Sequence, residues 1–182
     1  MNSSGPGRPR ALSRSLIVTA ARGIAEEEGL AALTVRRVAR RLGTGQASLY
    51  RHITDREQLL GLLAAEVAAQ LPPAAADPDP RQRVRHQWLA AHDHLSRHLW
   101  AAGILAEGTH LPSAAAHLTE DTLAALAAAG LPPDEAARTQ RVLWKLLLGH
   151  VRGARPSRFD FDWALSHLLD GVLGGRAVTL AG

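Results

Sequence analysis

The side chains best suited to chemical recognition lie close together, between positions 34 and 56. Gln46 carries an amide that can make two hydrogen bonds to an adenine, and Arg36 can reach a guanine or a phosphate. Tyr50 and His52 suit phosphate oxygens, contacts that fix position without reading sequence; the alternative for Tyr50 is a cap on a small core. The candidate DNA-contacting residues are Val35, Arg36, Gln46, Ala47, Ser48, Tyr50, His52 and Arg56.

Two short helices, at about 34–42 and 46–53, would position these side chains. Thr34 is a suitable N-cap for the first, and Gly43 follows its last apolar residue, where a left-handed turn favours glycine. Apolar residues recur four apart within each helix, which gives each one docking face: Val38 with Leu42, and Leu49 with Ile53. The pattern predicts a helix-turn-helix whose polar side chains are free to contact DNA.

Further helices flank this pair. A helix over about 12–28, stopped by Gly29, would complete a three-helix domain over 12–54. A connecting helix over 55–70 begins where Thr54 or Asp55 has capping-box spacing to Glu57 or Gln58. Residues 71–80 contain four prolines and therefore break the helix, so we expect a linker there. The predicted second domain is 81–182, with helices at about 80–101, 113–129, 133–153 and 160–173 and breaks at 103–112, 130–133 and 155–156.

The N-terminal third of the chain resembles the DNA-binding domain of the tetracycline-repressor (TetR) family of bacterial transcription regulators. The resemblance is specific in spacing as well as residue type, and departs from the family only in Arg56, where lysine is usual, and Ala47, where the tetracycline repressors have proline. It implies an all-α protein with a helical C-terminal domain for ligand binding and dimerisation, and a phosphate contact from Arg56. The residues that carry it are Leu33-Thr34-Val35-Arg36, Leu42-Gly43, Leu49-Tyr50-Arg51-His52 and Leu59-Leu60.

The distribution of charge agrees with a DNA partner. Residues 1–60 carry ten arginines and five acids, net +5, whereas the rest carries eleven bases and twelve acids, net −1, giving the total of +4. A basic face lowers the free energy of phosphate contact by counterion release; alone, the same charge is equally consistent with a solvated arginine-rich surface. Residues 1–11 should form a flexible basic arm, in which Arg8 and Arg10 either reach a minor groove or remain idle.

The overall composition is that of an ordinary globular protein. Of 182 residues, 46% are apolar and 21% charged, so disordered and fibrous classes are excluded. Cysteine is absent, which excludes disulfides, thiolate metal sites and a cysteine nucleophile. No apolar run is long enough to span a membrane and no signal core follows the N-terminus, so we expect a cytoplasmic protein without a cofactor.

Aromatic and histidine residues of the second domain could bind a small molecule. Apolar walls with a few polar groups suit such ligands, although each of these residues is individually more often part of a core. His94 and His98 lie four apart, but the glutamate of a zinc-hydrolase helix and a third ligand are lacking, so no metal is expected. The candidate effector-binding residues are Trp88, His92, Trp100, His110 and Trp144.

The helices at 133–153 and 160–173 are apolar over most of their circumference, so they need burial on two sides. Pairing them across a two-fold axis would give a homodimer with a four-helix bundle; the alternative is that both are internal to one monomer. The sequence therefore predicts a homodimeric repressor on a near-palindromic operator, released by an unidentified small molecule as the helix 55–70 moves. The alternatives are an all-helical enzyme using histidines of the second domain and a non-specific architectural DNA binder.

Overall fold

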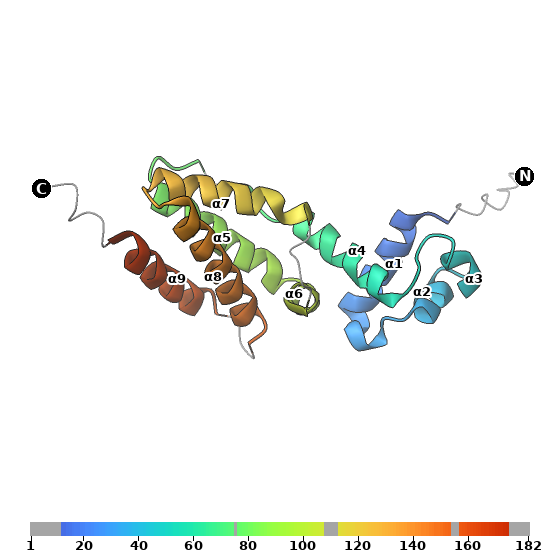
Figure 1. Cartoon of the computed structure of the whole chain (residues 1–182). Helices are drawn as coiled ribbons and strands as arrows, with labels where there is room; N and C mark the ends of the chain where they lie inside the picture. Colours follow the sequence, from blue (N-terminus) through green and yellow to red (C-terminus); the bar gives the residue numbers. More distant parts are fainter. Residues whose placement is uncertain (1–11, 75, 108–112, 154–156, 175–182) are drawn as a thin grey trace, which may run out of the picture. The chain divides into compact units, whose positions relative to one another are not determined.

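Residues 12–74, 76–107, 113–153 and 157–174 are described by the computed structural model, and within these ranges every regular element is a helix (Figure 1). The predicted all-α class is thus confirmed. The chain divides into two compact units, Met1–Leu63 and Ala64–Gly182, and the division falls inside helix α4 (Arg56–Ala69). No helix among the described residues is long and apolar enough to cross a membrane.

The first unit contains α1 (Arg14–Glu28), a short 3-10 turn η1 (Leu30–Ala32), α2 (Val35–Arg41), α3 (Gln46–Leu49) and the start of α4. Ser13 begins α1, because its hydroxyl accepts a hydrogen bond from Leu16 N at 3.2 Å. Gly29 ends α1 with φ of 81°, in the left-handed region. The apolar face of α1 is fully buried: Ile17, Ala21 and Ile24.

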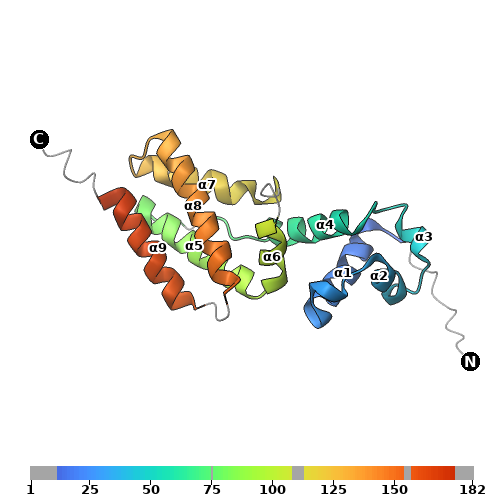
Figure 2. The same ribbon diagram turned by 60° about the horizontal axis from the view of Figure 1, so that its bottom comes forward.

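The second unit is a helical bundle around α5 (Pro80–Ser96). α5 packs on α6 (Leu99–Glu107), α7 (Ala116–Ala128), α8 (Pro133–Val151) and α9 (Arg158–Leu173), and a short 3-10 turn η2 (Ser113–Ala115) precedes α7 (Figure 2). Asp79 caps α5 by accepting a hydrogen bond from Arg81 N, and Pro80 occupies the first turn, where a missing N–H costs nothing. The largest side chains of this core are fully buried: Trp88, Leu95, Leu118, Leu126 and Phe161.

The predicted single helix over 80–101 is wrong, and the predicted break over 103–112 does not begin at Gly103, because α6 continues to Glu107; residues 108–112 lie outside the described residues. Three-residue turns, in which Arg97 N donates to His94 O and His98 N to Leu95 O, close α5 at Ser96. α6 then runs to Glu107, because burial of its apolar residues outweighs the low helix propensity of Gly103. No glycine or proline marks the true break. The buried α6 residues are Ala101, Ala102 and Leu105.

The helix expected over 46–53 is shorter than predicted. α3 comprises four residues, Gln46–Leu49, and a turn follows in which His52 N and Ile53 N both donate to Leu49 O. The helix expected over 12–28 begins at Arg14, and those expected over 133–153 and 160–173 are α8 and α9. These differences at the ends come from local capping, as at α1, where Ser13 supplies the cap.

Candidate nucleic-acid interface

The turn between α2 and α3 has the geometry that the sequence predicts. Thr34 Oγ1 accepts a hydrogen bond from Arg37 N at 3.1 Å and begins α2, and Gly43 adopts φ of 65° after its end. Leu49, on the inner side of α3, is fully buried, as are Val38 and Ile53. α3 is therefore fixed on its apolar side, and its opposite side faces solvent.

Five of the eight predicted DNA-contacting residues are exposed. Ser48 and His52 are half-buried, and the side chain of Val35 is buried in the core of the first unit. A side-chain contact from Val35 is therefore not supported, since the first residue of α2 turns its apolar side chain inward. The exposed residues are Arg36, Gln46, Ala47, Tyr50 and Arg56.

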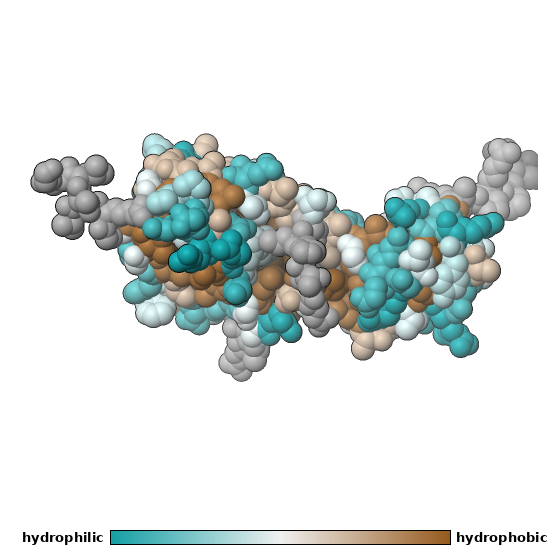
Figure 3. All heavy atoms as spheres, viewed as in Figure 1, coloured by the Kyte–Doolittle hydropathy of each residue, from teal (hydrophilic) through white to brown (hydrophobic). Residues whose placement is uncertain are grey.

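Tyr50 lies on the exposed side of the unit, directly after α3. Its side chain is 53% exposed, so it does not cap the small core, which was the alternative for this residue. Its ring and hydroxyl are free to reach a ligand outside the protein. On the face drawn in Figure 3, the first unit shows many hydrophilic residues, with hydrophobic residues between them.

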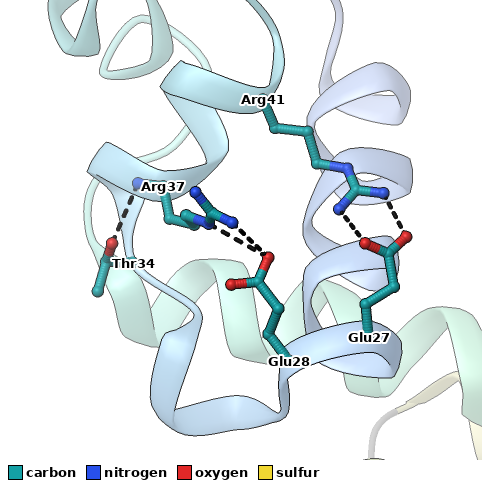
Figure 4. Close-up of polar contacts among 5 residues, drawn as sticks. All are labelled: Glu27, Glu28, Thr34, Arg37 and Arg41. Carbon is teal, nitrogen blue, oxygen red and sulfur yellow. Dashed lines mark hydrogen bonds and ion pairs between the residues drawn. The ribbon is translucent and has the colours of Figure 1, made fainter.

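Two of the basic residues of α2 are neutralised inside the unit. The guanidinium of Arg37 contacts Glu28 Oε1 at 2.7 Å, and that of Arg41 makes a two-pronged pair with Glu27, as Figure 4 shows. The hydrogen bond from Arg41 lowers the pKa of Glu27. These arginines join α2 to the end of α1, so they orient the helix-turn-helix and their charge is no longer fully available to phosphates.

Three other arginines, in α2 and after α3, carry positive charge that is not paired with a carboxylate among the described residues. Arg36, Arg40 and Arg51 are exposed and make no ion pair with the part of the chain that the structure describes. Arg40 and Arg51 were absent from the predicted site. The sequence could have indicated them. Arg36 and Arg40 lie four residues apart and so share one face of α2, whereas Arg37 and Arg41 share a different face of the same helix.

Arg56 serves the structure of the unit. Its Nε donates to Leu33 O at 2.9 Å and one terminal nitrogen donates to Leu30 O at 3.1 Å, which ties the start of α4 to the segment before α2. Of the two cap candidates, Asp55 supplies the cap, because its Oδ1 accepts from Gln58 N at 2.7 Å. The predicted phosphate contact of Arg56 would have to be made with its remaining N–H groups.

Three of the five predicted effector-binding residues are buried in the core of the second unit, and Trp100 packs against that core. Trp88 and Trp144 pack edge to face at 5.4 Å, and His92 stacks on Phe161 at 4.8 Å, a contact that the sequence does not reveal. Trp88, His92 and Trp144 are buried and Trp100 is half-buried, whereas His110 lies outside the described residues, as does the N-terminal arm with Arg8 and Arg10.

The buried polar atoms here are only partly paired. Trp88 Nε1 donates to Thr122 Oγ1 at 3.1 Å, but His92 Nε2 and Trp144 Nε1 have no hydrogen-bond partner among the described residues. Burial lowers the pKa of His92, so its imidazole is neutral at neutral pH. No group of three metal-ligating side chains occurs in the described ranges.

A short helix with an exposed polar side, fixed by a second helix and flanked by unpaired arginines, defines a helix-turn-helix DNA-binding protein. A family model for bacterial regulatory proteins of the tetR family matches residues 17–63. The chain is 46% identical over 65 residues to the transcriptional repressor DrrR1 of Streptomyces coeruleorubidus, and 37% identical over 59 residues to the class D tetracycline repressor of Escherichia coli. These matches span 36% and 32% of this chain but only 23% and 27% of those relatives.

The similarity of fold extends over both units. The crystal structure of BioQ with its double-stranded DNA operator aligns with 90% of this chain and 99% of its own, with 26% identity and a TM-score of 0.80. Residues 17–63 therefore match the DNA-binding domain of the tetR family of bacterial regulatory proteins, and the fold of both units is similar to that of BioQ.

Proposed function

We propose that this protein is a homodimeric transcriptional repressor that binds a near-palindromic operator and is released from it by a small molecule. The observation that carries the proposal is the exposed outer side of α3, on which Gln46 faces solvent while Leu49 is buried beneath it. The operator complex of BioQ, a protein similar over both units, supports it. A protein that works on the chromosome of a bacterium would act in the cytoplasm.

The roles of the contact residues follow from their chemistry. Gln46 would hydrogen-bond an adenine edge, and Arg36 a guanine or a phosphate. Tyr50 and the free arginines Arg40 and Arg51 would bind phosphates, while Ala47 and Ser48 offer a methyl group and a hydroxyl at short range. His52 and Arg56 would add phosphate contacts at the edge of the site.

Exposed large apolar side chains on the last two helices support the dimer. Trp163 and Phe159 of α9 are 61% and 79% exposed, and Val142 of α8 is 40% exposed. The opposite sides of the same helices are buried in the monomer through residues such as Leu143 and Leu165. Burial of such exposed apolar side chains against a second copy of the chain is favourable. The resulting dimer would place two α3 helices in successive major grooves, about 34–36 Å apart.

Release by an effector would act through the spacing of these two helices. A molecule that binds only an arrangement with the wrong spacing shifts the population away from DNA, and roughly 5.5 kcal/mol of differential binding moves a 1:99 equilibrium to 99:1. Trp88, His92, Trp100 and Trp144, with His110, are the proposed effector contacts. The unpaired nitrogens of His92 and Trp144 could each gain a hydrogen bond to a ligand, and α4 would carry the movement.

The experiment that tests this function is fluorescence anisotropy on the DNA upstream of the gene and on scrambled DNA, across a salt series. We expect the upstream DNA to bind about 10³-fold or more tightly than scrambled DNA. Gln46→Ala and Tyr50→Ala should each weaken the specific complex. Glu120→Ala, an exposed residue of α7, is the matched control and should bind like the wild type.

Equal, weak binding to both DNAs that neither substitution changes would contradict a specific operator in that region. The architectural alternative predicts this outcome, with affinity set by salt alone.

A further inference from the structure

The C-terminal end of α4 is held by side chains from α5 and α7. His94 Nε2 lies 3.1 Å from Val67 O, and His117 Nε2 lies 2.9 Å from Leu71 O. A carbonyl oxygen can only accept, so each imidazole donates through Nε2. Both acceptors belong to almost fully buried residues, so these bonds are made in a region that water reaches poorly.

The sequence after α4 explains why side chains are needed there. The last four carbonyl groups of a helix have no partner within it, and a following chain often supplies N–H groups to them. Pro72 and Pro73 have no N–H to supply. Ala74 carries the first amide after the prolines, and it donates to Asp121 Oδ2 of α7 at 3.0 Å. Val67 O and Ala68 O accept from the backbone amides of Gln70 and Leu71. The side chains of His94, His117 and Asp121 add three further bonds to the end of α4 and to the segment that follows it.

The same network continues into the core of the second unit. Asp121 Oδ2 also accepts from Gln87 Nε2 at 3.2 Å, and Gln87 Oε1 lies 3.3 Å from the hydroxyl of Thr122. That hydroxyl accepts from Trp88 Nε1 at 3.1 Å. The single proton of that hydroxyl is shared between Gln87 Oε1 and Leu118 O, which lies closer at 2.7 Å. Polar contacts thus lead from Ala74, in the segment after α4, to Trp88, a proposed effector contact.

We propose that His94, His117 and Asp121 are positioning residues that fix the end of α4 and thereby set operator affinity without touching DNA. The inference rests on the proposed function. Its physical basis is that α4 is one continuous helix, whose first turn is bonded to the DNA-binding unit through Arg56. When the C-terminal end of α4 is fixed by these bonds, α4 can adopt fewer orientations. A larger fraction of dimers then has its two α3 helices spaced to enter two major grooves at once.

His117→Leu is the decisive variant, because His117 is half-buried and its loss leaves the core intact. We expect operator affinity to fall about tenfold, which corresponds to roughly 1.4 kcal/mol. His117→Gln keeps an N–H donor and should restore much of the affinity. The matched control is Gln140→Leu, which removes the bond from Gln140 Nε2 to Thr119 Oγ1, a link between α7 and α8 that does not involve α4.

Hydrogen exchange on the full-length wild type and variants gives a second readout that needs no DNA. The amides of Ala68 to Leu71 and of Ala74 should exchange faster in His117→Leu than in Gln140→Leu. Equal exchange there, or equal loss of operator affinity in both variants, would overturn the positioning role. If the amides exchange faster in His117→Leu but the wild type binds no operator specifically, the role of His117 in holding α4 is supported. The proposed function is then rejected, and the effect on operator affinity is rejected with it.

Discussion

Arginines that look alike in the sequence have different roles in the first unit. Arg37 and Arg41 are paired with carboxylates at the end of α1, whereas Arg36 and Arg40 remain exposed on the other side of α2. Net charge alone therefore overstates the charge that can meet phosphate. The pairing partners decide which arginines orient the unit and which bind DNA.

Arg40→Ala should flatten the salt dependence of DNA binding. Removing one phosphate contact reduces the slope of log K against log salt by about 0.9, so we expect that change with little effect on thermal stability. The control Arg37→Ala should chiefly destabilise the unit, because it leaves Glu28 without its partner. Anisotropy across a salt series measures the slope, and thermal unfolding measures stability. An unchanged slope in Arg40→Ala would exclude a phosphate contact.

His92 should make the second unit sensitive to acid. Burial, the largest cause, and the nearby charges of His150 and Arg158 lower its pKa, whereas Asp93 opposes them. The unfolded chain then binds more protons, so stability is lost as pH falls through the ordinary value of about 6.5. His92→Phe, which preserves stacking on Phe161, should reduce this loss. Urea unfolding at several pH values between 7.5 and 5 measures the free energy of unfolding of the wild type and of His92→Phe. An identical pH dependence in the two proteins would contradict this role of His92.

At the scale of the element, the helix-turn-helix depends on one backbone conformation. Gly43 has φ of 65°, and apart from its chain neighbours no described atom lies within 4 Å of the place that a Cβ would take, so an added side chain meets strain without a clash. Gly61 lies in α4, also with open space around it, but its φ is ordinary for a helix. The two glycines therefore separate the effect of conformation from that of packing.

Gly43→Ala should destabilise the protein by about 1 kcal/mol, because the left-handed conformation costs roughly that much for a residue with a Cβ. Gly61→Ala, the control, should stabilise it by up to about 1 kcal/mol, since alanine favours helix. Urea unfolding compares the two. A neutral effect of Gly43→Ala would show that the turn can adopt another conformation.

At the scale of the whole molecule, operator binding should depend on the exposed rings of α9. Trp163→Glu places a charge in the proposed dimer interface, so we expect monomers that remain folded but lose specific operator binding, since one α3 helix makes few base contacts. Sedimentation gives the oligomeric state and anisotropy the affinity. Leu99→Glu is the control, because Leu99 is also exposed, at 52%, but belongs to α6, which is not one of the two proposed interface helices. A Trp163→Glu dimer that binds the operator normally would place the interface elsewhere.

The helix-turn-helix, and most of the other helices apart from α6, could be predicted from the sequence alone. Thr34, Gly43 and the four-residue apolar spacing act locally, so their consequences can be derived without knowing the rest of the fold. The family resemblance rests on the same residues, which is why the protein class could be predicted. The outward-facing Gln46 and Tyr50 followed from the same periodicity.

The pairing of polar residues and the exact ends of several helices could be seen only in the folded protein. The break between α5 and α6 is marked by no glycine or proline, and the inward side chain of Val35 and the backbone bonds of Arg56 depend on neighbours distant in the sequence. The same holds for His94 and His117, whose acceptors lie 27 and 46 residues away. A hydrogen bond across such a separation has no periodic signal, because the fold alone brings its two ends together.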